Sequence, residues 1–388
     1  MSYKILTLNN ISVKGLRRLP RDSFEVASEI GHPDAILVRS YNLHDFDIPD
    51  TVKAIGRAGA GVNNIPVDAM THRGVPVFNA PGANANAVKE LVIAAMLLAA
   101  RNICSAWRYV LELGAEGAEL DKLVEAGKKK FVGFELPTRT LGVVGLGAIG
   151  GEVANAAHAL GMRVVGFDPQ LTVEHAWKLS SGIEQARSLD DLFSRADIVS
   201  FHVPLNESTR HLANAERIGL LPTGAVILNF ARSGIVDDAA VEAALAAGKL
   251  SGYVTDFPVA GLKDHPKVVA LPHLGASTGE AEENCAVMVA DNVRDFLENG
   301  NIRHSVNFPE SQMPREGDNR LTIANMNVPN MVGQISTCLA DAGLNIHDML
   351  NKSRGDIAYT LVDLDGVLQE ETMSRIRAID GVLSARIV

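Results

Sequence analysis

LGVVGLGAIGGEVANAAHALGMRVVGFDP, residues 141–169, is the stretch that decides the fold of this chain. It predicts a buried apolar strand, an Ala-rich helix and a second strand, in that order. The glycines Gly145, Gly147 and Gly150 form the pattern G-x-G-x-x-G between the first strand and the helix, and Asp168 ends the second strand. This order of elements is typical of a βαβ unit that binds a dinucleotide.

Each residue type in this motif has a physical role. Gly145 permits the tight turn out of the strand, Gly147 lets a pyrophosphate approach the backbone, and Gly150 lets the helix pack closely on the strand. The N-terminus of the helix offers free N–H groups and a positive dipole end to phosphates. Asp168 would accept hydrogen bonds from the adenosine ribose and repel a 2′-phosphate, so we expect NAD as the cofactor. The alternative is a glycine turn in another α/β fold.

The composition limits the classes of protein to consider. The chain has 388 residues, of which 47% are hydrophobic and 21% charged, and this predicts a globular protein of two or three domains. A net charge of −10 argues against nucleic acid or an anionic membrane as a partner. The longest apolar run, residues 91–100, is too short to span a bilayer, and residues 1–10 lack the apolar segment of a signal peptide.

The cysteine pattern bears on the compartment and on metal binding. Cys104, Cys285 and Cys338 are far apart in the sequence and odd in number. They predict reduced core thiols, with neither a disulfide framework nor a metal site. We therefore expect a cytoplasmic protein.

Residues 1–82 alternate short apolar runs with turns, which predicts a small flavodoxin-like α/β unit with a parallel sheet. Two loops at its predicted strand ends carry cations: one contains Arg39 and Ser40, the other contains Arg57 followed by Gly59, Ala60 and Gly61. Such donor-rich loops at the carboxyl ends of strands suit an anionic ligand. The alternative is a plain turn with a solvated arginine.

After the glycine motif, apolar segments alternate with helix-like ones as far as residue 273. This alternation predicts a doubly wound parallel sheet of the Rossmann type. The polar residues that end the predicted strands should lie at the ligand-binding edge of the sheet: His202, Pro204, Arg232, Asp256 and His273.

The remaining segments complete the expected domain organisation. An amphipathic helix over 280–299 should return to the first domain, and residues 301–318, with their prolines, predict a linker. Residues 319–388 predict the order βαββαβ of a ferredoxin-like module that serves binding or assembly. We predict three domains. A discontinuous substrate domain comprises residues 1–82 and 284–308, a cofactor domain comprises residues 83–283, and a C-terminal module comprises residues 319–388.

Arg232 and His273 are the predicted catalytic pair. A guanidinium can grip a carboxylate bidentately, and an imidazole can exchange a proton with a hydroxyl group at neutral pH. With NAD as hydride acceptor, this chemistry fits an alcohol next to a carboxylate. The alternatives are a structural ion pair for Arg232 and a core or capping role for His273.

Five motifs together resemble the D-isomer-specific 2-hydroxyacid dehydrogenases over almost the whole chain. They are GRAGAGVNN from residue 56, GLGAIGGEVA from 145, FHVPLNEST from 201, NFARSGIVD from 229 and PHLGAST from 272. Within this family the set is most similar to members that oxidise 3-phospho-D-glycerate to 3-phosphohydroxypyruvate with NAD, the first step of L-serine biosynthesis. The C-terminal module resembles an ACT regulatory domain.

The resemblance implies the following site residues. The cofactor would contact Gly145, Gly147, Ala148, Ile149, Gly150, Asp168, Pro204, Ala231, Arg232, Ser233, Asp256, His273, Gly275 and Ala276. The substrate would contact Arg39, Ser40, Arg57, Gly59, Ala60 and Gly61. An L-serine effector would contact Asn325, Asn327 and Asn345, although the segment NVPNMVGQ lacks the basic and glycine residues of the usual serine-binding loop. Edge pairing of ferredoxin-like sheets would give a homodimer or homotetramer.

One departure from the family concerns the acid that pairs with the catalytic histidine. The family usually has a glutamate five residues after the position of Asp256, where this chain has Gly261. We take Asp264 as the candidate acid, with Asp256 as the alternative. A partner carboxylate would fix the tautomer of His273.

The same sequence features are compatible with two other functions. A dehydrogenase for another D-2-hydroxy acid, such as 2-hydroxyglutarate, would use the same fold. Arg39, Arg57 and the lysines at 128–130 favour a doubly anionic substrate over lactate. An NAD-sensing regulatory protein with weak catalysis is the alternative from another class, and the missing glutamate supports it.

Overall fold

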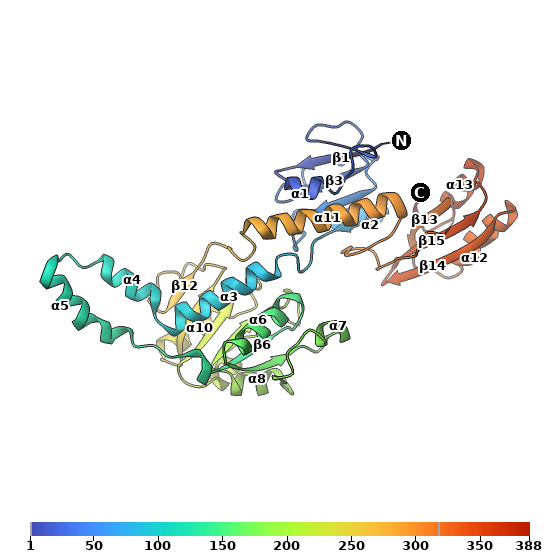
Figure 1. The fold of residues 1–388 in the computed structure, drawn as a ribbon. Helices are drawn as coiled ribbons and strands as arrows, with labels where there is room; N and C mark the ends of the chain where they lie inside the picture. The colour runs from blue at the N-terminus through green and yellow to red at the C-terminus, as the bar shows by residue number, and fades with distance from the viewer. Residues whose placement is uncertain (1, 317–318) are drawn as a thin grey trace. The chain divides into compact units, whose positions relative to one another are not determined.

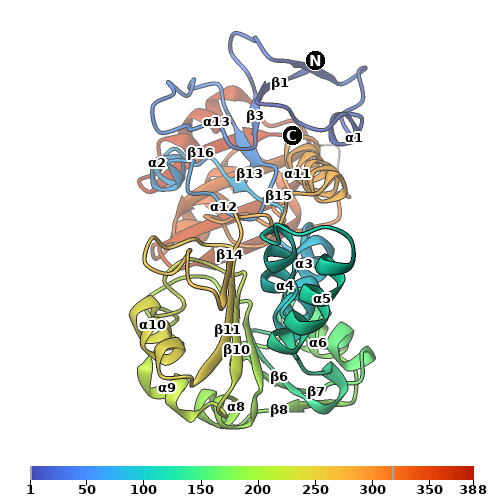
Figure 2. The same ribbon diagram turned by 90° about the vertical axis from the view of Figure 1, so that its left-hand side faces the viewer.

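The computed structural model describes residues 2–316 and 319–388, and the chain divides into two compact units. Unit 1 comprises Met1–Ala83 and Gly279–Val388, and unit 2 comprises Asn84–Thr278. Figures 1 and 2 show the course of the chain.

Unit 2 contains a seven-stranded sheet in the order β12-β11-β10-β9-β6-β7-β8, with every pairing parallel. The order reverses between β6 and β9, which confirms the predicted doubly wound sheet. The strands are β6 Thr140–Val144, β7 Arg163–Phe167, β8 Ile183–Gln185, β9 Ile198–Phe201, β10 Ala225–Asn229, β11 Leu250–Thr255 and β12 Val268–Ala270.

Helices cover both faces of this sheet, because apolar side chains from alternate strand positions are buried on each side. One core contains Leu141 and Val143 of β6 with residues of α3 and α6; the other contains Val144 and Val199 with residues of α8, α9 and α10. Figure 2 shows α9 and α10 on one side of the sheet and α3 and α6 on the other. These helices are α3 Ala85–Ala100, α6 Ala148–Ala159, α8 Leu189–Arg195, α9 Ala215–Leu220 and α10 Asp238–Ala246, and a short α7 spans Val173–Ala176.

A helical arm extends from the rest of unit 2 between α3 and β6 (Figure 1). It consists of α4 Ile103–Leu111, α5 Gly117–Gly127 and the 3-10 turn Lys128–Phe131. None of the residues of α4 is buried, although the helix carries an apolar stripe of Ile103, Trp107, Val110 and Leu111. Trp107 and Leu111 are 66% and 65% exposed.

Unit 1 begins with a five-stranded parallel sheet in the order β2-β1-β3-β4-β5. The strands are β1 Tyr3–Leu8, β2 Phe24–Ala27, β3 Ala35–Val38, β4 Ala54–Arg57 and β5 Val77–Phe78, accompanied by α1 Val13–Leu16 and α2 Val67–His72. The predicted parallel α/β unit is confirmed, with β2 as a strand that the sequence analysis does not predict.

The long helix α11, Gly279–Asn299, packs against α1 and the β3, β4 and β5 strands of this sheet (Figure 1). Its buried side chains recur at helical spacing, as at Cys285, Val289 and Val293. Gly56 of β4 permits the close approach, since a Cβ there would lie 2.7 Å from a methyl carbon of Val289.

The C-terminal part of unit 1 forms a four-stranded antiparallel sheet in the order β14-β15-β13-β16. The predicted order βαββαβ is confirmed: β13 Asn319–Met326, α12 Met331–Asp341, β14 Asn345–Arg354, β15 Ile357–Asp365, α13 Glu370–Arg377 and β16 Val382–Ile387. One face of the sheet packs on α12 and α13 through side chains such as Ile323, Ile335 and Ile376.

The other face of this sheet packs on the rest of unit 1. Ala324, Tyr359 and Leu361 share a core with Phe296 of α11 and with Phe308. The predicted linker over 301–318 contains no helix or strand in the residues that the structure describes, but it is packed, because Phe308 and Met313 are buried and Ile302 bridges Ser311.

Hydrogen bonds attach this second face to the C-terminal end of α11. Arg320, fully buried, donates to the carbonyl oxygens of Asn299 and Met313 at 3.0 and 2.9 Å, and it forms a bidentate ion pair with the buried carboxylate of Asp363. The Tyr359 hydroxyl donates to the Gly300 carbonyl at 2.8 Å. Arg386 donates to the Leu297 carbonyl at 3.2 Å. The C-terminal sheet therefore supplies donors to the free carbonyls of Leu297 and Asn299 in the last turn of α11, while Arg315 donates to that of Glu298.

Candidate active site

The glycine loop of unit 2 has the form that a pyrophosphate site needs. Gly145 has φ of +89°, and a Cβ there would meet the His202 carbonyl at 2.5 Å. A Cβ on Gly150 would lie 1.8 Å from the Gly145 carbonyl, whereas the space beside Gly147 is open. Gly147 caps α6 without a side-chain hydrogen bond, so the first N–H groups of this helix have no capping side chain. The loop and the helix end therefore fit a dinucleotide pyrophosphate.

His202 lies beneath this loop, directly after β9. Burial lowers the pKa of His202 to about 3, so the imidazole is neutral at physiological pH. Its Nε2 is 2.9 Å from the Ser200 hydroxyl. His202 thus approaches the loop through its carbonyl and Cβ, and its neutral imidazole bonds Ser200 of β9.

Asp168 connects the second strand of the motif to the glycine loop. Its two carboxylate oxygens accept hydrogen bonds from the N–H groups of Leu146 and Gln170, both at 2.9 Å. The carboxylate is half-buried beside the loop and keeps lone pairs for a further donor. This is the place at which the predicted contact with the adenosine ribose would form.

We expect Asp168→Asn to reduce discrimination between NADH and NADPH by about tenfold, because the repulsion of a 2′-phosphate by a carboxylate is removed. Dissociation constants from fluorescence titrations with both nucleotides measure this effect. Asp190→Asn, which removes an exposed carboxylate paired with Arg217, is the control. An unchanged ratio in Asp168→Asn would exclude the predicted role.

The remaining predicted cofactor residues occupy the same edge of the sheet. Ala148 and Ile149 open α6, and Pro204 is exposed after β9. Ala231 is buried and Ser233 exposed after β10, while Gly275 is buried and Ala276 exposed after β12.

Arg232 follows β10 in a turn organised by Asn229. The buried amide of Asn229 accepts from the Ala231 N–H at 3.3 Å and donates to the Arg232 carbonyl at 3.0 Å. The Arg232 guanidinium bonds the Ala231 carbonyl at 2.7 Å through Nη1. Arg232 is exposed, so the rest of its donor fork faces outward and can take a carboxylate.

His273 follows β12 and is held by Asp256, which follows the neighbouring strand β11. The Asp256 carbonyl accepts from the His273 N–H at 3.1 Å, and its carboxylate accepts from the N–H groups of Leu274 and Gly275 at 2.8 and 2.7 Å. Asp256 is 1% exposed, and His273 has a left-handed φ of +57°. Asp256 thus holds the backbone of the loop that contains His273. The imidazole of His273 is exposed and packs against Phe257.

Arg232, Asp256 and His273 therefore follow three adjacent parallel strands at one edge of the sheet. Asp264 lies in an exposed turn, where its side chain is 82% exposed and forms an ion pair with Lys263 at 2.8 Å. Within residues 2–316 and 319–388, no carboxylate forms a hydrogen bond with the His273 imidazole. The partner acid of His273 thus stays a prediction.

The predicted substrate residues lie in unit 1 at the carboxyl ends of β3 and β4. Arg57 Nε donates to the Arg39 carbonyl at 3.1 Å, which brings the two loops together. The Ser40 N–H donates to Asn9 after β1 at 3.1 Å. A Cβ on Gly59 would lie 1.8 Å from the Arg57 guanidinium, so this glycine leaves room for the arginine to fold back.

The following loop is fixed by backbone groups. Gly59 O accepts from the Ala80 N–H at 3.0 Å, and Ala60 O accepts from the Asn79 amide at 2.6 Å; Gly61 follows in the same loop. The partner of Arg39 is not evident from the sequence: Glu282 of α11 pairs with its guanidinium at 2.6 Å.

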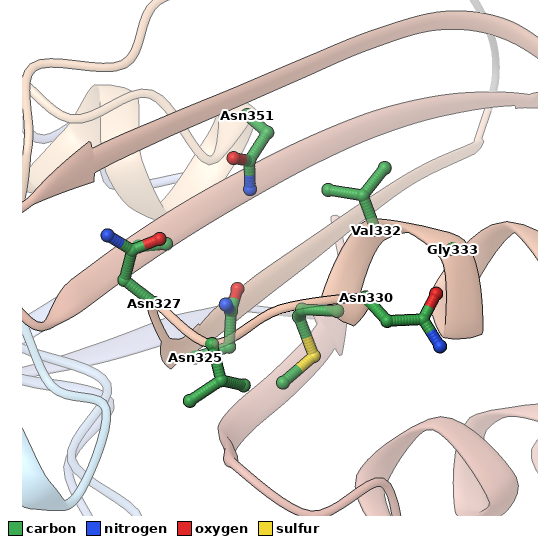
Figure 3. A pocket seen from close by; sticks show the side chains of 9 residues that line it. Asn325, Asn327, Asn330, Val332, Gly333 and Asn351 are labelled. Carbon is green, nitrogen blue, oxygen red and sulfur yellow. The ribbon is translucent and has the colours of Figure 1, made fainter.

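A pocket of about 140 Å³ lies in the C-terminal part of unit 1 (Figure 3). The predicted effector residues Asn325 and Asn327 line it together with Asn330 and Asn351, which the sequence analysis does not find. Asn345 is not among its lining residues and bonds Asp365 at 2.8 Å. The lining amides offer both donors and acceptors, as an amino acid would need.

Two kinds of feature are absent from residues 2–316 and 319–388. No group of three or more His, Cys, Asp or Glu side chains is arranged to hold a metal ion in these residues. None of the described helices combines the length and the apolar character needed to cross a membrane.

Comparison with known proteins agrees with this geometry. The family described as D-isomer specific 2-hydroxyacid dehydrogenase, NAD binding domain, matches residues 93–275. A D-3-phosphoglycerate dehydrogenase of Haemophilus influenzae is 35% identical over 347 residues, which are 86% of this chain and 81% of that protein. One of Methanocaldococcus jannaschii is 36% identical over 349 residues, which are 88% of this chain and 63% of that protein.

A solved structure shares the fold. NAD⁺-bound 3-phosphoglycerate dehydrogenase of Entamoeba histolytica superposes with a TM-score of 0.61 at 27% identity, over 79% of this chain and 99% of that one. The glycine loop lies at the same edge of the sheet as Arg232 and His273, and the relatives share most of the length of this chain. This chain belongs to the D-isomer-specific 2-hydroxyacid dehydrogenase family.

Proposed function

We propose that this protein is an NAD-dependent dehydrogenase that oxidises 3-phospho-D-glycerate to 3-phosphohydroxypyruvate. The observation that carries the proposal is the alignment of Arg232 and His273 with the glycine loop at one edge of the unit 2 sheet. The names of the two curated relatives support the choice of substrate.

Residues of unit 2 bind the substrate carboxylate and accept the hydroxyl proton. The Arg232 guanidinium binds the substrate carboxylate and so orients C2 with its hydroxyl group. His273 accepts the hydroxyl proton at an imidazole nitrogen as the alcohol becomes a ketone. Bound NAD supplies the acceptor for the hydride that leaves C2. The buried Asp256 keeps the His273 loop in place by accepting the N–H groups of Leu274 and Gly275.

The residues of unit 1 supply the recognition of the phosphorylated end. Arg39 and Arg57 bring two guanidinium groups to adjacent strand ends, and the guanidinium fork matches the geometry of phosphate oxygens. Ser40 and the loop of Gly59, Ala60 and Gly61 add hydroxyl and backbone donors. Asp264 is the proposed acid for His273, and Asp264→Asn tests this assignment through turnover and its pH profile.

NADH formation at 340 nm with 3-phosphoglycerate and with 2-hydroxyglutarate tests the proposed function. Turnover of the phosphorylated acid supports it, and turnover of 2-hydroxyglutarate alone would identify another D-2-hydroxy acid as the substrate. Tight NADH binding without turnover of either acid would instead indicate an NAD-sensing regulatory protein.

We also propose that the asparagine pocket in unit 1 binds an amino acid effector such as L-serine. Calorimetric titration with L-serine should detect binding to the wild type, and Asn327→Ala should weaken it about tenfold through the loss of one hydrogen bond to a charged group. Asn345→Ala is the matched control, because Asn345 is outside the pocket lining. Absence of serine binding to the wild type would leave this sheet a role in assembly.

We further propose a cytoplasmic homodimer or homotetramer. The exposed apolar stripe of α4, with Trp107 and Leu111, supports association of copies through the helical arm. The edges of the C-terminal sheet, β14 and β16, offer a second surface. Sedimentation velocity measures the mass, and the free cysteines are compatible with a reducing compartment.

A further inference from the structure

Glu282 in the first turn of α11 stands against one of the two arginines assigned to the substrate. Its Oε1 lies 2.6 Å from Nη2 of Arg39, and the two side chains are 43% and 38% exposed. The N-terminal dipole of α11 favours a carboxylate at this position. The ion pair is therefore partly exposed and accessible to an incoming anion.

The other arginine belongs to the same cluster. Arg57 bonds the Arg39 carbonyl, and the buried Cys285, one helical turn after Glu282, lies in the field of all three charges. Burial raises the pKa of the Cys285 thiol above its ordinary value, Arg57 and Arg39 oppose this rise, and Glu282 adds to it. Arg39, Arg57 and Glu282 thus form a compact charged group around the start of α11.

This group carries a net charge of one positive unit, since Glu282 offsets one of the two guanidinium groups. A phosphate monoester brings roughly −1.5 to −2 at neutral pH, so it exceeds the positive charge that this cluster leaves. To bind phosphate with its full fork, Arg39 must exchange the Glu282 carboxylate for a phosphate oxygen. Glu282 also repels the phosphate directly while it remains nearby.

We propose that Glu282 is a specificity-determining residue that limits affinity for the phosphorylated end of the substrate by competing for Arg39. The proposal rests on the assignment of Arg39 to the substrate site. Its consequence is selective: Glu282 weakens binding of acids with a phosphate group and has little effect on acids without one. The same competition speeds release of a phosphorylated product.

Glu282→Gln tests this proposal, because it keeps the size of the side chain and removes its charge. We expect KM for 3-phosphoglycerate to fall about two- to fivefold, the range for a partly exposed ion pair, with KM for glycerate unchanged. Glu283→Gln is the matched control, since Glu283 is the next residue of α11 and pairs with Lys14 on another part of the surface. It should leave both constants unchanged.

A double-mutant cycle assigns the effect to Arg39. In the Arg39→Gln background, Glu282→Gln should no longer lower KM for 3-phosphoglycerate, because there is no Arg39 guanidinium for Glu282 to occupy. An unchanged or higher KM for 3-phosphoglycerate in Glu282→Gln, or an equal fall for glycerate, would overturn the proposal.

Calorimetry with inorganic phosphate in the absence of cofactor separates this proposal from the proposed function. Tighter phosphate binding by Glu282→Gln supports the competition even if the wild type does not turn over 3-phosphoglycerate. Turnover by the wild type with no change in phosphate affinity or KM on substitution would leave the proposed function standing and exclude the role of Glu282.

Discussion

His273→Gln is expected to lower kcat for the 2-hydroxy acid by about 10²- to 10⁴-fold, the usual contribution of a positioned general base. Glutamine keeps a polar side chain of similar reach but cannot accept the hydroxyl proton. The backbone of the loop should survive the substitution, because Asp256 holds it through the N–H groups of residues 273–275. The dissociation constant of NADH should therefore change little.

Steady-state kinetics with a parallel NADH titration separate the two effects. Asp264→Asn is an informative comparison, because Asp264 is exposed and paired with Lys263. If Asp264 orients His273, its variant should lose part of the same rate and alter the pH profile. Retention of wild-type kcat by His273→Gln would exclude His273 as the base, and loss of NADH affinity by the same factor would indicate a structural role.

Arg320→Met is expected to lower the free energy of unfolding of unit 1 by about 3–5 kcal/mol. The substitution leaves the buried Asp363 carboxylate without its bidentate partner. It also removes the donor from the carbonyls of Asn299, Met313 and Pro314. Methionine fills much of the volume, so the loss reports mainly the unpaired polar groups.

Hydrogen exchange of the β13 and β15 amides should measure this change. Tryptophan fluorescence would not, because Trp107 and Trp177, the two tryptophans of the chain, lie in unit 2. Arg375→Met is the control, since Arg375 forms an exposed pair with Asp341, and its variant should exchange like the wild type. Wild-type protection in Arg320→Met would show that the buried pair adds nothing net.

The ion pair of Arg320 and Asp363 makes the stability of unit 1 depend on pH in the acid range. Burial alone would raise the pKa of Asp363, but hydrogen bonds from Arg320 and the Glu316 N–H and the charge of Arg320 outweigh it, so the pKa lies below its ordinary value. A carboxyl group with a lowered folded pKa stabilises the fold above its unfolded pKa, about 3.9. This stabilisation is lost as the pH falls further, through the folded pKa. Arg320→Met should lack this part of the acid dependence.

The sequence predicts the large features of the fold because they depend on periodicity. The strands of both parallel sheets that carry fully buried runs, such as β3 and β9, are found from their apolar residues. The strands that it misses, β2 and β8, lie at sheet edges and expose part of their length. A short edge strand needs few apolar residues, so its sequence resembles a loop.

Site residues are predictable where topology alone brings them together. Arg232 and His273 end parallel strands of one sheet, and parallel strands direct their carboxyl ends to one edge. The pair of Arg39 and Glu282 joins residues that are distant in the sequence, and local patterns do not indicate such a contact. The register of β14 shifts between Ile346 and Asp348, so the sequence does not indicate that Asn351, and not Asn345, lines the pocket.

The attachment of the C-terminal sheet to the end of α11 has a consequence for dissecting this protein. Deletion of residues 319–388 would remove Arg320, Tyr359 and Arg386 together, and with them donors to the carbonyls of Asn299, Gly300 and Leu297. It would also uncover Phe296 and Phe308, which share a core with Tyr359. A shortened chain should therefore aggregate or melt at a lower temperature, and intact unit 1 should give a single calorimetric transition.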